Sequence, residues 1–230
     1  MRTIAGFFCD AARTERTMPS RKTNGLLITF EGIDGCGKST QLKMAARYLR
    51  SRGLDIATLR EPGSTRISER IRRMLLDPRL DMSDITELLL YEAARSELVD
   101  KEIAPLLAAG RIVLCDRYYD STTAYQGYGR RLDLTMVRRL HEVAVGAYTP
   151  DLTLLFDLPL KTALTRRGKN PDRLESQSLA FFRRVARGFR EIARNEPRRV
   201  TVLDARKSTA RVFVAVQREL DRKLKLPPLP

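Results

Sequence analysis

The stretch ITFEGIDGCGKSTQLKMAARYL, residues 28–49, runs from an apolar segment through glycines into a helical pattern. Its residues Gly32, Gly37, Lys38 and Ser39 match the spacing G-x-x-x-x-G-K-[ST], between a predicted strand and a predicted helix. Backbone N–H groups of such a loop, and the positive end of the helix, can surround a phosphate. Lys38 would reach the β- and γ-phosphates, and Ser39 would ligate Mg²⁺. The sequence therefore predicts a P-loop, whose nucleotide contacts come from Gly32, Ile33, Asp34, Gly35, Cys36, Gly37, Lys38, Ser39 and Thr40.

Strand and helix patterns alternate through the rest of the chain. Helical spacing is clear in 39–53, 65–76, 84–108 and 134–146, and a last helix is expected in 208–223. Alternation of this kind predicts a parallel sheet covered on both faces. We therefore expect a doubly wound α/β fold with five parallel strands, in 26–31, 56–61, 111–119, 151–158 and 200–205.

Charged residues stand at the carboxyl ends of these predicted strands, where right-handed crossovers would bring them to one edge. Asp116 follows an apolar strand and can hold Mg²⁺ beside the P-loop, and Arg117 would lie nearby as an anion ligand. Arg60 can clamp a second anion opposite the P-loop, because a guanidinium suits bidentate phosphate binding. A buried sheet has no structural need for so much charge at one edge, so this edge is the predicted site.

A basic segment between the last two predicted strands is a candidate lid. Arg166, Arg167 and Arg173 flank a predicted turn around Gly168 and Pro171. A loop of this composition could close over a nucleotide and bring positive charge to a moving phosphoryl group. We place this lid at about residues 166–175.

Bulk composition limits the remaining possibilities. The 230 residues suit one domain, expected over 25–224, with a basic and disordered arm at 1–24 and an extended tail at 225–230. No apolar run is long enough to span a bilayer, and three cysteines without metal-ligand spacing suggest a reducing, cytoplasmic setting. The net charge of +15 favours anionic partners, which leaves a nucleic-acid-stimulated ATPase as an alternative.

Six motifs occur in an order that resembles the thymidylate kinase family: FEGIDGCGKST, LREPGST, YEAAR, DRYYDSTTAYQGYGR, PDLTLLFD and DRLESQSLAFFRRV. They cover about residues 25 to 220. The resemblance implies a nucleoside monophosphate kinase-like fold that uses ATP and Mg²⁺ to convert dTMP to dTDP. It also implies a homodimer, with neither a membrane nor a specific nucleic acid as a partner. A kinase of another pyrimidine monophosphate is the nearest alternative.

The resemblance also implies roles for individual residues. Asp34 would contact the 3′-hydroxyl of dTMP, and Arg60 and Arg117 would hold its phosphate. Tyr91, in place of the usual phenylalanine, would stack on thymine, and Arg95 would hydrogen-bond the base. Ser121, Thr122, Tyr125 and Gln126 would surround the base and sugar.

Catalysis in the resembling family uses an arginine from either the P-loop or the lid. This P-loop has none, so the resemblance implies that the charge comes from Arg166, Arg167 or Arg173, together with Lys38 and Arg117. The sequence also departs from the family at Ser64, where EPGGT is usual. A backbone conformation with positive φ at Ser64 would be strained.

Overall fold

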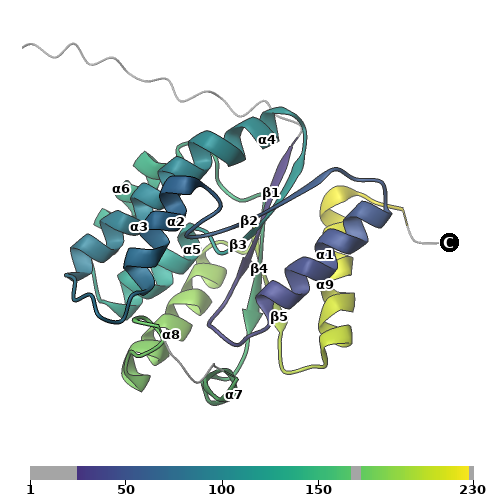
Figure 1. The fold of residues 1–230 in the computed structure, drawn as a ribbon. Helices are drawn as coiled ribbons and strands as arrows, with labels where there is room; N and C mark the ends of the chain where they lie inside the picture. Colours follow the sequence, from purple (N-terminus) through teal and green to yellow (C-terminus); the bar gives the residue numbers. More distant parts are fainter. Residues whose placement is uncertain (1–24, 167–171, 228–230) are drawn as a thin grey trace, which may run out of the picture.

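The computed structural model describes residues 25–166 and 172–227 (Figure 1). The predicted arm at 1–24 and Arg167 lie outside these described residues, as do parts of the predicted lid and tail.

A five-stranded parallel sheet forms the centre of the molecule, in the order β2-β3-β1-β4-β5. The chain enters at β1 and crosses to β2 and β3 on one side before it reaches β4 and β5 on the other, which confirms the doubly wound fold. Neighbouring strands are in register at their carboxyl ends, where Phe30 lies opposite Asp116. The strands are β1 (Leu26–Glu31), β2 (Ile56–Arg60), β3 (Ile112–Asp116), β4 (Leu152–Asp157) and β5 (Val200–Asp204).

Helices cover both faces of this sheet (Figure 1). One face carries α1 (Lys38–Ser51) and α9 (Thr209–Leu224). The other carries α2 (Arg66–Leu76), α3 (Asp84–Leu98), α4 (Ala104–Ala108), α6 (Leu134–Val145) and α8 (Leu179–Asn195), while α7 (Leu160–Thr165) lies at the carboxyl edge of the strands.

Alternate residues of each strand point to opposite faces, which gives the molecule two apolar clusters. Ile28 and Leu114 belong to the cluster that includes α1 and α9. Leu27 and Val113, one residue earlier in each strand, belong to the cluster with α3, α4 and α6. Strands buried on both sides explain why the sequence shows continuous apolar runs there.

Two segments differ from the predicted elements, a helix over 84–108 and a strand over 111–119 that ends at Asp116 in the structure. The pattern over 84–108 forms α3, a π-helical turn η1 (Val99–Ile103) and α4, rather than one regular helix. The segment after β3 forms a short helix, α5 (Tyr119–Thr122), followed by a second π-helix, η2 (Thr123–Gly129). π-Helical turns are often found at functional sites, and η2 carries two of the residues predicted to surround the base.

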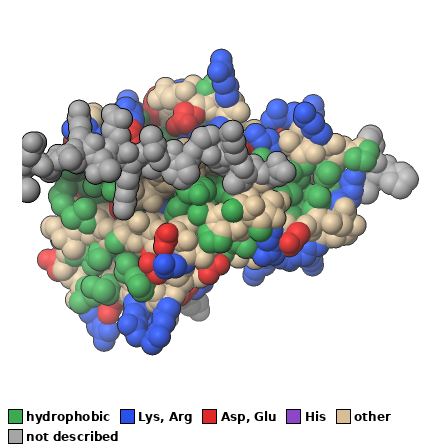
Figure 2. All heavy atoms as spheres, turned by 90° about the horizontal axis from the view of Figure 1, so that it is seen from above, with side chains coloured by type: hydrophobic (Ala, Val, Ile, Leu, Met, Phe, Trp, Pro, Cys, Tyr) green, Lys and Arg blue, Asp and Glu red, His purple; other side chains and the backbone are tan. Residues whose placement is uncertain are grey.

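Basic side chains are spread over the surface. On the part of the face in Figure 2 that the described residues form, they stand around the edge, with hydrophobic side chains between them. They do not form one continuous stripe across that face. Among the described residues, no helix combines the length and apolar character needed to cross a membrane.

Candidate active site

The P-loop joins β1 to α1 through two positions whose backbone conformation favours glycine. Gly35 and Gly37 have φ of 82° and 92°, and a Cβ at Gly35 would lie 2.5 Å from the carbonyl oxygen of Ala163. Gly37 is also the N-cap residue directly before α1, and the first turn of this helix has no side-chain cap and no acidic residue. The first backbone N–H groups of this helix are therefore available to an anion.

Ser39 and Asp116 meet at the start of α1, as predicted for a metal site. The Ser39 hydroxyl donates a hydrogen bond to Asp116 Oδ2. The other carboxylate oxygen, Asp116 Oδ1, is buried without a hydrogen-bond partner among the described residues. A hydroxyl beside a carboxylate oxygen that lacks a partner fits Mg²⁺, which takes oxygen ligands and leaves other positions to phosphates and water.

Asp34, Arg117 and Tyr125 form one hydrogen-bonded group between the P-loop and the sheet edge. Arg117 Nη2 lies 2.6 Å from Asp34 Oδ1, and the Tyr125 hydroxyl donates to Asp34 Oδ2 at 2.9 Å. Lys38 Nζ lies 3.4 Å from Asp34 Oδ1. Burial by itself would raise the pKa of Asp34, but Arg117 and Lys38 hold that pKa well below its usual range. Asp34 is therefore an ionised hydrogen-bond acceptor.

Glu31 fixes the backbone that presents Arg117. Its carboxylate accepts hydrogen bonds from the N–H of Tyr118 at 2.7 Å, the N–H of Ser121 at 3.3 Å and the hydroxyl of Ser121 at 2.6 Å. It thereby caps α5, which has no side-chain cap of its own. Arg117 has φ of 70°, and its Nη1 donates to Ser121 Oγ at 2.8 Å. A residue of β1 thus holds the strained arginine after β3.

A central cavity opens beside this group. Arg72 of α2 also lines it, although no sequence motif singled out this residue. Arg72 Nη1 donates to the carbonyl of Pro62 at 3.0 Å, and burial together with neighbouring arginines lowers its pKa. The structure brings eight predicted residues together in the cavity wall, namely Asp34, Tyr91, Arg95, Arg117, Ser121, Thr122, Tyr125 and Gln126.

Arg60 is the predicted acceptor-site residue that does not line the central cavity. Its side chain is 55% exposed and makes an ion pair with Glu69 at 2.9 Å. It faces a groove that it shares with Ser39 and Asp116. The loop that follows Arg60 includes Ser64, whose φ is 69°. This is the strained backbone conformation expected where serine replaces the usual glycine. Arg60 as a phosphate ligand stays a prediction.

Arg95 is held on three sides within the wall of the central cavity. Its Nε donates to Glu61 at 2.8 Å, Nη1 to Glu92 at 2.5 Å and Nη2 to the hydroxyl of Thr122 at 2.8 Å. Its side chain is 1% exposed. Glu92 in turn lies 3.0 Å from Nδ1 of His141. Protein groups therefore fix the orientation of the guanidinium, and any contact with a base would add to them.

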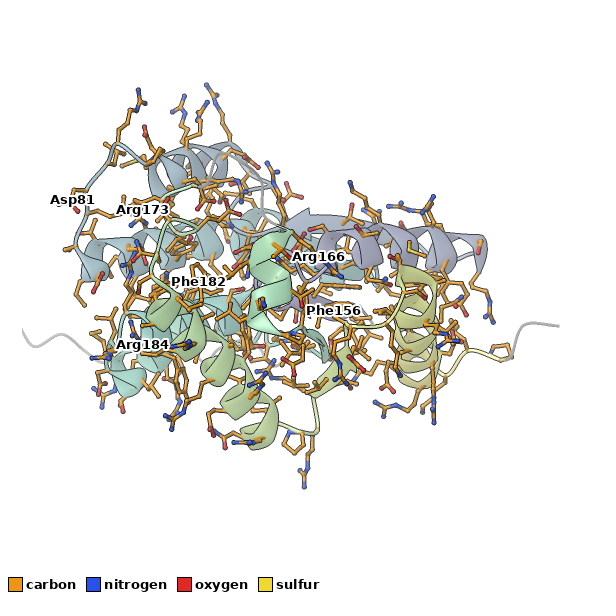
Figure 3. The ribbon with its side chains drawn as sticks, turned by 90° about the horizontal axis from the view of Figure 1, so that it is seen from below. Asp81, Phe156, Arg166, Arg173, Phe182 and Arg184 are labelled. Atoms are coloured by element: carbon orange, nitrogen blue, oxygen red, sulfur yellow. The ribbon has the colours of Figure 1, made fainter. Side chains whose placement is uncertain are left out.

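The candidate lid arginines point to different parts of the site (Figure 3). Arg166 follows α7 and lines a second cavity, the P-loop cavity, with Gly35, Gly37 and Thr40. Arg173 lies beside α2 and α3, where Nη1 is 2.6 Å from Glu87 and Nε donates to the carbonyl of Leu75 at 2.9 Å. Of the two candidates that the structure describes, Arg166 is the one beside the phosphate loop.

The P-loop cavity extends to the segment between β5 and α9, whose residues were not among those predicted for the site. Arg206, Lys207 and Thr209 line it opposite the glycines. This space could hold the part of a nucleotide beyond its phosphates. The side chains come from the far end of the chain, and no motif in the sequence ties them to the P-loop.

Comparison with known proteins identifies the family. A family model for thymidylate kinase matches residues 30–216. A thymidylate kinase of Chlorobium luteolum is 43% identical over 211 residues, which span 87% of this chain and 99% of that protein. One from Dehalococcoides mccartyi is 47% identical over 204 residues, or 88% and 99% of the two chains. This chain belongs to the thymidylate kinase family.

A solved structure agrees with the thymidylate kinase assignment. The crystal structure of thymidylate kinase from Ehrlichia chaffeensis superposes with a TM-score of 0.71 at 34% sequence identity, covering 86% of this chain and 98% of that one. The residues 30–216 that the family model matches include the P-loop, the central cavity and the candidate lid. The resemblance inferred from the sequence motifs is therefore confirmed, while the individual site residues stay predictions.

Proposed function

We propose that this thymidylate kinase transfers the γ-phosphoryl group of ATP to dTMP, giving ADP and dTDP. The observation that carries the proposal is the position of Arg117. It contacts the carbonyl of Gly32 in the P-loop at 3.2 Å and also lines the central cavity. A donor phosphate on the P-loop and an acceptor phosphate in the cavity would meet at this guanidinium.

Catalysis would come from holding the two substrates in line and from stabilising the negative charge of the transferred phosphoryl group. No covalent intermediate is needed. Lys38, Arg117 and Arg166 would face the negative charge that spreads over the phosphoryl group during transfer. Mg²⁺ held by Ser39 and Asp116 would neutralise charge on the phosphates of ATP. Asp34 keeps Arg117 and Tyr125 in place and offers an acceptor to a sugar hydroxyl.

Acceptor choice follows from the shape of the central cavity. Tyr91 and Arg95 both line this cavity, and Tyr91 would stack its ring on a pyrimidine. Tyr125 is buried, and its hydroxyl is already committed to Asp34, so it cannot turn away from an added ribose 2′-hydroxyl. A deoxyribonucleotide with a single-ring pyrimidine base fits these constraints.

We also propose a homodimer through α2, α3 and α6. Helix α3 packs against α2 and against α6. Exposed apolar side chains occur on all three helices, at Ile67, Met74, Ile85, Leu89 and Val143. The pairs on α2 and α3 are separated by seven and four residues, which places each pair on one helix face. A second copy of the chain is the occupant we expect, and a cytoplasmic location stays a prediction.

The first test replaces Lys38 with alanine. Because Lys38 is buried in the P-loop and would contact the transferred phosphate, turnover should fall by about 10²–10³-fold or more. Circular dichroism should show an intact fold, and Lys101→Ala, an exposed lysine in η1, is the control. Turnover near that of the wild type in folded Lys38→Ala would contradict the donor site.

A further inference from the structure

A fully buried carboxylate, Glu87 of α3, lies behind the wall of the central cavity. Its Oε1 accepts from Gln126 Nε2 at 2.7 Å and Arg130 Nε at 3.2 Å. Its Oε2 accepts from Arg130 Nη2 at 2.9 Å and is paired with Arg173 Nη1 at 2.6 Å. Four donor atoms from three side chains therefore converge on one carboxylate.

These partners keep Glu87 ionised. Burial alone would raise its pKa, but Arg130, Gln126 and Arg173 lower that pKa below its usual value. An ionised carboxylate can only accept hydrogen bonds. The amide of Gln126 must therefore direct its nitrogen at Glu87, because its oxygen would meet another acceptor there.

The orientation of this amide matters because Gln126 lines the central cavity and Glu87 does not. The nitrogen is drawn behind the wall, and Oε1 is the acceptor that the side chain can offer on the cavity side. The backbone of Gln126 is held as well, since its carbonyl accepts from the N–H of Leu132 at 3.3 Å. The side chain is 1% exposed, so an amide flip has little room.

We propose that Glu87 determines base choice by locking the Gln126 amide with its oxygen toward the acceptor. A locked acceptor selects a pyrimidine that carries a hydrogen on N3, as thymine and uracil do. Cytosine places an unprotonated N3 at that position, so two acceptors would face each other. The proposal rests on the proposed placement of the acceptor in the central cavity. Glu87 acts through Gln126 and is a positioning residue.

A buried polar site that hydrogen-bonds a substrate N–H or O–H can discriminate strongly against an analogue without that group. The ratio of the two kcat/KM values can reach about 10⁴. We expect wild-type kcat/KM for dTMP to exceed that for dCMP by at least about 10³-fold on the same grounds. In Glu87→Gln the new amide can either donate or accept a hydrogen bond. The Gln126 amide can then rotate and present its nitrogen to the cavity. The dTMP to dCMP ratio should then narrow by about tenfold or more.

The matched control is Arg173→Met. It removes one ion pair from the same carboxylate but leaves the contact between Glu87 and Gln126, so the dTMP to dCMP ratio should stay within about twofold even if turnover falls. Glu87→Gln leaves Arg173 without its ion-pair partner and could therefore fail to fold. In that case the double variant Glu87→Gln/Arg173→Met is used, because it also removes this unpaired arginine. Arg173→Met is then the reference for the ratio.

Steady-state kinetics with ATP and either dTMP or dCMP, on wild type and each variant, tests the proposal. A narrowed ratio in folded Glu87→Gln, with an unchanged ratio in Arg173→Met, supports it. An unchanged ratio in folded Glu87→Gln, or equal narrowing in Arg173→Met, overturns it. Gln126→Met tests the base contact itself, because an unchanged dTMP to dCMP ratio in this folded variant would show that Gln126 does not distinguish the two bases and would also overturn the proposal.

Discussion

Arg95 is the residue at which structural and binding roles coincide. The family resemblance implied a base contact, and the structure adds ion pairs to Glu61 and Glu92, all three side chains being buried. Burial raises the pKa of Glu61 to about 7 even though Arg95 opposes that rise. The guanidinium therefore neutralises carboxylates that would be costly to bury alone.

Replacing Arg95 with alanine should consequently affect stability as well as dTMP binding. Removing one partner of a buried ion pair costs about 3–5 kcal/mol, because the other charge is left without compensation. Urea unfolding should show this loss, and Arg95→Ala/Glu61→Gln should recover part of it. An unfolding free energy within about 0.5 kcal/mol of the wild type would contradict the structural role.

Residues within a contiguous motif were predictable from the sequence, and residues that depend on distant partners were not. Lys38 and Ser39 follow from local spacing, and the structure places them in the predicted loop. Arg72 was missed because arginines occur all along its helix. The one available signal was its spacing of four from Ser68 and three from Leu75, the two buried residues of α2.

At the scale of elements, strands were easier to predict than the segment after β3. A buried strand is an apolar run, whereas a π-helix has no simple period in the sequence. The cap of α5 is also invisible in local sequence, because Glu31 lies about ninety residues before the N–H groups that it accepts. The orientation of Arg117 thus depends on strand pairing between β1 and β3.

The capping carboxylate should make stability depend on pH. Burial, followed by the charge of Asp120, raises the pKa of Glu31 from 4.5 to about 7. The folded state therefore holds this proton more tightly than the unfolded chain. The contribution of Glu31 to stability is present below pH 4.5 and is lost as pH rises through about 7.

Urea unfolding between pH 5 and pH 8 can isolate this contribution. We expect the free energy of unfolding to fall less steeply with rising pH in Glu31→Gln than in the wild type. Glu61 has a similarly raised pKa but is present in both proteins, so it cancels in the difference. Identical slopes would show that Glu31 titrates as it does in the unfolded chain.

For the whole molecule, the proposed dimer surface can be tested by measuring the oligomeric state in solution. Leu89 of α3 is 49% exposed, and Val214 of α9, on the opposite face of the sheet, is 64% exposed. In sedimentation velocity the wild type should be a dimer, Leu89→Arg a monomer and Val214→Arg a dimer. A buried arginine without a partner would disfavour the interface by several kcal/mol. A monomeric wild type, or an unaltered Leu89→Arg dimer, would contradict this surface.

The proposed transfer from ATP to dTMP is tested most directly by acceptor choice. The measurement is steady-state phosphoryl transfer from ATP to dTMP, dUMP, UMP and dGMP. One methyl group in an apolar pocket gives about 10–200-fold discrimination, so dUMP should react more slowly than dTMP. UMP should be poorer still because its 2′-hydroxyl would meet Tyr125, and dGMP should not react because two rings would collide with Tyr91. We expect the rate of transfer to decrease in the order dTMP, dUMP, UMP, with no transfer to dGMP. UMP turned over as well as dTMP, or transfer to none of the four, would contradict it.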